Sequence, residues 1–103
     1  MYKLSVFVPE SHLELLKTAL FEVGAGRIGR YAHCSWQALG QSQFRPLENS
    51  RPYSGTIGQL CTTNEYKLEM VVANEQIKSA IAALKQAHPY EEPAYECWKL
   101  ADF

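Results

Sequence analysis

The sequence predicts a small α+β domain of the ferredoxin-like type, a sandwich in which a four-stranded antiparallel sheet carries two helices on one face. Four segments show strand-like alternation or β-branched enrichment, and two repeat apolar residues at helical spacing. These segments follow one another in the order βαββαβ, which is the split βαβ arrangement. With 103 residues, the chain is near the commonest domain size, so we expect a single domain over residues 1–103.

The first strand is expected over residues 2–8, where alternation separates a face toward the helices from a face away from them. The face toward the helices consists of Leu4, Val6 and Val8. Ser11 and Glu14 then have capping-box spacing, which predicts a helix from about Ser11 to Val23. Its apolar stripe comprises Leu13, Leu16, Leu20 and Val23, and Gly24 supplies a left-handed cap.

The second and third strands are expected at residues 30–39 and 65–73. Residues 40–64 between them lose periodicity and gain Gly, Pro, Ser and Asn, which predicts a long functional loop. In this interpretation, the sheet face away from the helices carries Ser5, His33, Ser35, Gln37, Lys67 and Glu69. Cys34 has the opposite phase and is expected to face the helices as a small buried hydrophobe.

Asn74 is expected to cap the second helix, which ends before His88, and residues 94–100 are expected to form the fourth strand. The right-handedness of crossovers then places residues 40–64 and the turn 88–93 at one edge of the sheet. The glycine-rich segment 24–29 falls at the opposite edge.

Charge and composition exclude several classes of function. The net charge is -1 and the basic residues are dispersed, so no nucleic-acid partner is expected. No apolar span is long enough for a membrane helix or a signal peptide, so we expect a cytoplasmic protein without a membrane role. The three cysteines are odd in number and lack CxxC spacing, which favours reduced thiols.

The turn from His88 to Pro93 is the most distinctive candidate site. It gathers an imidazole, a phenol and two carboxylates, from His88, Tyr90, Glu91 and Glu92. These groups suit a divalent metal ion, a proton transfer or a polar ligand. The alternative is that the two prolines stiffen the entry to the last strand while the glutamates are simply solvated.

The sheet face away from the helices is the second candidate. Phe7 and Val71 would be exposed there in a monomer, so self-association through this face is expected. His33 and Glu69 are expected on neighbouring strands of the same face. They would bind a cation or form a hydrogen bond across an interface.

Several segments resemble the YqfO-type insertion domain of the NGG-interacting-factor (Nif-three-like) dinuclear-metal proteins. They are Gly24-Ala25-Gly26-Arg27-Ile28-Gly29-Arg30-Tyr31, His33-Cys34-Ser35, Phe44-Arg45-Pro46, Pro52, Gly55 and His88-Pro89-Tyr90-Glu91-Glu92-Pro93-Ala94-Tyr95. The resemblance implies a fold similar to the PII signalling proteins and CutA, which are trimers. It also implies that the two metals are held by a flanking domain that this chain does not contain. The chain departs from the pattern at Gly40-Gln41-Ser42, where the family usually has Gly-x-Gly.

We therefore expect a standalone homotrimeric module that binds a metal ion, a small ligand or a partner protein and requires no cofactor beyond a possible divalent metal ion. The expected metal ligands are His88, Glu91, Glu92, His33 and Glu69, and the expected ligand contacts are Tyr90, Phe44 and Arg45. No catalytic residue is assigned. The alternatives are a small metal-dependent enzyme with a site between subunits and a purely structural adaptor.

Overall fold

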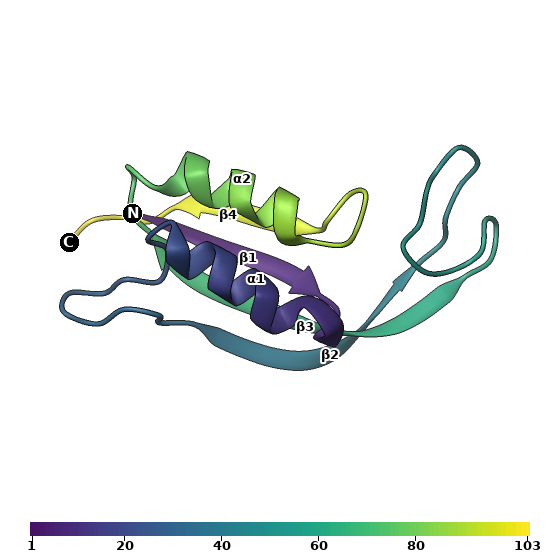
Figure 1. The fold of residues 1–103 in the computed structure, drawn as a ribbon, viewed down its shortest axis with the longest axis horizontal. Helices are drawn as coiled ribbons and strands as arrows, with labels where there is room; N and C mark the ends of the chain where they lie inside the picture. The colour runs from purple at the N-terminus through teal and green to yellow at the C-terminus, as the bar shows by residue number, and fades with distance from the viewer.

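A computed structural model describes residues 1–103, and it confirms the predicted fold class and element order. The elements are β1 (Tyr2–Val8), α1 (Glu10–Glu22), β2 (Trp36–Phe44), β3 (Cys61–Val72), α2 (Ile77–Ala87) and β4 (Tyr95–Lys99). The sheet is antiparallel with strand order β2-β3-β1-β4, and both helices cover one of its faces (Figure 1).

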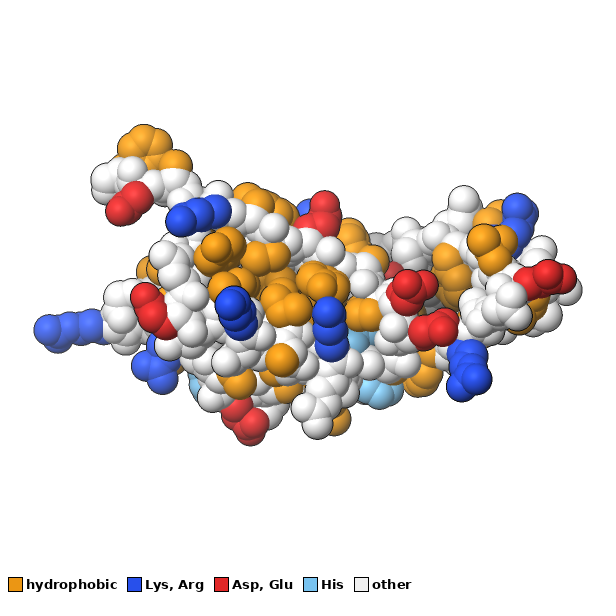
Figure 2. All heavy atoms as spheres, turned by 90° about the horizontal axis from the view of Figure 1, so that it is seen from above, with side chains coloured by type: hydrophobic (Ala, Val, Ile, Leu, Met, Phe, Trp, Pro, Cys, Tyr) orange, Lys and Arg blue, Asp and Glu red, His pale blue; other side chains and the backbone are white.

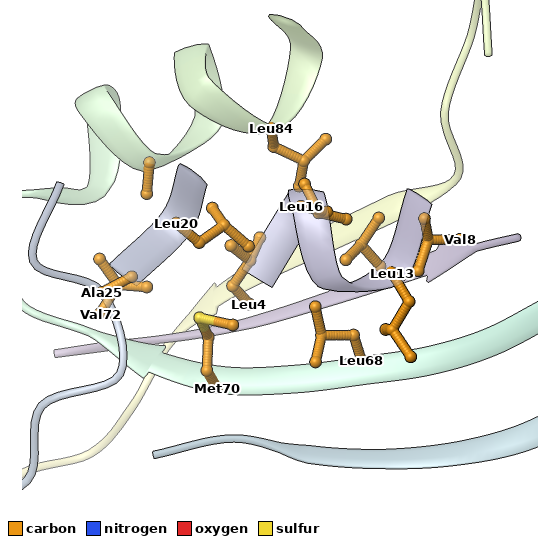
Figure 3. Close-up of a cluster of buried hydrophobic side chains, with 12 residues drawn as sticks. Leu4, Val8, Leu13, Leu16, Leu20, Ala25, Leu68, Met70, Val72 and Leu84 are labelled. Carbon is orange, nitrogen blue, oxygen red and sulfur yellow. The ribbon is translucent and has the colours of Figure 1, made fainter. Parts of the chain in front are cut away.

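The hydrophobic core lies between the two helices and the sheet (Figure 3). β1 contributes Leu4, Val6 and Val8, and α1 contributes Leu13, Leu16 and Leu20, as the alternation and the helical spacing predict. Each fully buried leucine or valine stabilises the fold by about 1.5–3 kcal/mol relative to an exposed one. The remaining core residues are Ala25, Leu68, Met70, Val72, Ala80 and Leu84.

The start of α1 differs from the capping-box prediction. α1 begins at Glu10, directly after Pro9, and has no side-chain cap. The Ser11 hydroxyl instead lies 2.8 Å from Nδ1 of His12, and Glu14 pairs with a lysine one turn along the helix. Pro9 needs no cap for its own backbone because it has no N–H group.

Asn74 does not cap α2, which begins at Ile77. Its side-chain oxygen accepts a hydrogen bond of 2.6 Å from the N-terminal ammonium group of Met1. A turn over residues 74–76 therefore precedes the helix, and Asn74 holds the N-terminus, which leads directly into β1.

The second and third strands form a longer hairpin than predicted. β2 ends at Phe44 rather than at residue 39, and β3 begins at Cys61 rather than at residue 65. The connecting loop is therefore residues 45–60. We call the outer part of this hairpin, residues 40–64, the arm; it projects past the body of the molecule, whose extents are 46 × 24 × 24 Å (Figure 1).

The predicted phase of the second strand is wrong. The strand starts at Trp36 rather than at residue 30, and Trp36 pairs with Glu69 on the face away from the helices. Gln37 points to the helix side, where its side chain accepts a hydrogen bond of 3.2 Å from Lys17. Alternation cannot be counted through His33 because its backbone is left-handed, with φ of 58°.

The two chain ends lie next to each other at the end of the molecule opposite the arm (Figure 1). The backbone N–H of Leu100 donates a hydrogen bond of 2.9 Å to the carbonyl oxygen of Met1. The three cysteines are free thiols. No helix has the length and apolar character needed to cross a membrane.

Candidate functional site

His88 caps the end of α2 and connects three parts of the chain. Its backbone N–H donates to the carbonyl oxygen of Leu84 at 2.9 Å. Nε2 of its ring lies 2.7 Å from the carbonyl oxygen of Phe7, and Nδ1 accepts a hydrogen bond of 3.2 Å from the backbone N–H of Tyr90. Because Nδ1 is an acceptor, the ring proton sits on Nε2 and is donated to Phe7.

Burial decides the charge state of His88. The residue is only 6% exposed, and the loss of hydration lowers the pKa of its imidazole from the ordinary 6.5, although the hydrogen bond to Phe7 opposes the shift. A neutral ring with both nitrogens engaged has no free lone pair for a metal ion. In this structure, His88 acts as a brace between α2, β1 and the turn.

A groove of about 480 Å³ lies where the arm meets the 88–93 turn and the end of β1. The predicted contact residues Phe44, Arg45 and Tyr90 all line it, as do Glu91 and Glu92. Its other lining residues are Phe7, Ser42, Gln43, Pro46, Leu47, Ser50, Pro52, Tyr53, Ser54, Glu65 and Ala94. The predicted meeting of the long loop and the turn is thus confirmed.

The turn and the arm are held together by direct contacts. A side-chain oxygen of Glu91 accepts a hydrogen bond of 2.9 Å from the backbone N–H of Arg51. The rings of Tyr53 and Tyr90 lie with their centroids 5.8 Å apart, and the Tyr90 ring lies 4.9 Å from that of His88. Figure 2 shows acidic side chains at this junction between the body and the arm.

Glu65 is a groove residue that the sequence did not reveal as part of a site. It is only 6% exposed, and neither of the two ion pairs in the molecule, Lys17–Glu14 and Lys67–Glu69, involves it. Burial raises the pKa of the neighbouring Tyr90 phenol, and the Glu65 carboxylate adds to that shift by hydrogen bonding and charge. Alternation along β3 places Glu65 on the same sheet face as Lys67 and Phe7, but that pattern does not predict its burial in the groove.

The prediction that His33 and Glu69 lie on neighbouring strands of one sheet face is wrong. Glu69 lies on β3 opposite Trp36, on the face away from the helices. His33 lies in the loop before β2 and stacks on Phe21 of α1, with ring centroids 4.7 Å apart and planes 9° from parallel. No group of three or more His, Cys, Asp or Glu side chains is placed to hold a metal ion.

The sheet face away from the helices has no covering layer. Trp36 and Trp98 project from its edge strands β2 and β4 and are 58% and 45% exposed. At the centre of this face, the Ser5 hydroxyl is buried and has no hydrogen-bond partner. We call this surface the open face.

Comparisons with known proteins place the chain beside one segment of much longer proteins. It is 41% identical over 102 residues to a protein of Halalkalibacterium halodurans named GTP cyclohydrolase 1 type 2 homolog. It is 40% identical over 96 residues to the protein of the same name from Bacillus subtilis. These matches cover 99% and 93% of this chain but only 27% and 26% of the relatives, so the chain spans about a quarter of their length. No family model matches the chain.

The solved structures agree with this placement. A Bacillus cereus protein related to NIF3 superimposes with a TM-score of 0.84 at 37% identity, covering 98% of this chain and 26% of that one. The PII-like protein CutA from Nostoc superimposes with a TM-score of 0.69 at 18% identity, covering 97% of this chain and 81% of that one. The first match confirms the relation to NIF3-type proteins that the motifs indicate, and the second shows the CutA/PII-like fold.

Proposed function

Starting from a chain that is related over its full length to one segment of the NIF3-related proteins and has a CutA/PII-like fold, we propose that it is an oligomeric ligand-binding module. It assembles as a homotrimer through the open face. It binds a small molecule in the groove between the arm and the 88–93 turn.

The observation that carries the assembly is the open face itself. Two tryptophans exposed on one uncovered sheet surface favour burial against another sheet, because aromatic side chains bury large areas. The Ser5 hydroxyl on this face is already shielded by its neighbours within one chain, so the two tryptophans carry the argument for assembly.

The groove supports ligand binding rather than catalysis. Its volume of about 480 Å³ suits a small molecule, and apolar walls with a few polar groups are typical of such sites. The name GTP cyclohydrolase 1 type 2 homolog describes proteins about four times as long. We do not extend that activity to this chain, because it spans only about a quarter of their length.

A metal-dependent enzyme assembled between subunits is the less favoured alternative, and its expected ligands Glu91 and Glu92 remain available at the rim of the groove. Glu91 is already engaged by the Arg51 N–H, which reduces its capacity to coordinate an ion. Stoichiometric metal in protein purified without chelators would favour this alternative.

Light scattering on the purified chain tests the assembly. We expect a mass three times the 11.7 kDa of one chain at micromolar concentration. A mass of 11.7 kDa at all concentrations would refute the trimer.

A further inference from the structure

We propose that the groove selects an organic cation, an ammonium or guanidinium group carried on an apolar or aromatic stem. The inference rests on the proposed ligand-binding function and specifies the chemical class of its ligand.

More acidic than basic side chains line the groove. Three carboxyl groups line it, from Glu65, Glu91 and Glu92, against a single guanidinium, that of Arg45. Arg45 is exposed and forms no ion pair with any of the three. The groove therefore carries acidic groups that no cation of the molecule neutralises.

Glu65 is the acidic residue of the groove that is most shielded from water. The residue as a whole is only 6% exposed, it lines the groove, and it has no ion-pair partner. An ionised carboxylate away from water is unfavourable unless a cation or several hydrogen bonds accompany it. The Tyr90 phenol, whose pKa the Glu65 carboxyl group helps to raise, is a polar neighbour of Glu65 in the groove. A cation entering the groove would complete the pairing.

The walls of the groove are rich in aromatic side chains. Four aromatic rings line the groove, from Phe7, Phe44, Tyr53 and Tyr90. Aromatic faces attract cations through their quadrupole and also pack against an apolar stem. An anion would meet both the carboxylates and the negative ring faces, so the same walls reject it.

The test compares three probes of one shape on the wild-type protein. Benzylammonium, benzyl alcohol and benzoate differ in charge but share a ring and one polar group. We expect amide chemical shifts of groove residues such as Tyr90 to move with benzylammonium, and its affinity to exceed that of benzyl alcohol by about tenfold or more. Equal binding of the three probes, or preferential binding of benzoate, would overturn the proposal.

A charge variant localises the effect. Glu65→Gln keeps the shape of the side chain and removes its charge, so benzylammonium affinity should fall by about tenfold while benzyl alcohol binding is unchanged. Glu75→Gln is the matched control, because Glu75 is exposed in the turn before α2 and does not line the groove. Unchanged benzylammonium binding in a folded Glu65→Gln protein would refute the role of Glu65.

The source of the cation is also distinguishable. If a basic side chain of a second copy fills the groove, Glu65→Gln would change the mass measured by light scattering, and no free probe would bind. That result overturns the small-molecule proposal and leaves assembly intact. Probe binding to an 11.7 kDa species would instead overturn the trimer and keep the ligand class.

Discussion

The ring of His88 is hydrogen-bonded to the backbone carbonyl of Phe7, a residue that lies 81 positions earlier in the chain, with Nε2 and the oxygen 2.7 Å apart. This contact joins the end of α2 to the end of β1, next to the groove residues Phe7 and Tyr90. His88 therefore holds the last turn in register with the central strand.

Replacement of His88 by Ala should lower the free energy of unfolding by about 1–3 kcal/mol, because the Phe7 carbonyl and the Tyr90 N–H lose a buried partner. Urea unfolding followed by circular dichroism measures the change. Gln86→Ala is the control, since Gln86 is exposed on the same helix and its side chain forms no hydrogen bond. Equal effects of the two replacements would contradict the bracing role.

Acidification should destabilise the protein through the same residue. Burial lowers the pKa of His88 in the folded state below its ordinary 6.5, so the unfolded chain binds more protons over that interval. The stabilising contribution is complete above about pH 6.5 and is lost as the pH falls toward the folded-state pKa. The difference in unfolding free energy between the wild type and His88→Gln should shrink between about pH 7 and about pH 5. A constant difference would exclude this titration.

Gly26→Ala should destabilise the fold by about 1–3 kcal/mol, because the backbone there has φ of 76° and a Cβ atom would lie 2.8 Å from the carbonyl oxygen of Cys34. Gly40→Ala is the matched control, since its Cβ atom meets open space. The control should change stability by no more than about 0.5 kcal/mol. Thermal unfolding of both variants measures these changes. A Gly26→Ala protein as stable as the wild type would show that the loop adjusts to the added Cβ atom without cost.

Trp98→Glu should dissociate the proposed trimer, because a charge would replace an aromatic ring that the proposed contact through the open face buries. Light scattering should then give 11.7 kDa. Leu15→Glu introduces the same charge at an exposed position of α1, on the helix side of the sheet, and should leave the mass unchanged. A Trp98→Glu protein with the wild-type mass would exclude the open face as the interface.

The sequence correctly predicted the segments in which buried and exposed residues alternate regularly. It failed where the backbone leaves the extended conformation and interrupts that alternation. Alternation placed Leu4, Val6 and Val8 correctly because β1 is extended throughout and paired on both sides. The phase of β2 failed because the left-handed backbone of His33 interrupts the counting before the strand begins.

The same distinction holds for the groove. Phe44-Arg45-Pro46 and the segment from His88 to Tyr95, two separate segments that resemble the Nif-three-like family, predicted contact residues that line the groove. Glu65 was missed because its burial arises only where the arm and the 88–93 turn meet. No local pattern around a strand glutamate records such a meeting.

The paired chain ends have a consequence for how such a domain is shared among proteins. Because the backbone N–H of Leu100 is hydrogen-bonded to the carbonyl oxygen of Met1, the chain leaves the domain beside the point where it enters. A host protein carrying this segment within its sequence would need to open only one surface loop, and its own strands and helices could keep their positions. The groove, at the far end, would then face outward from the host.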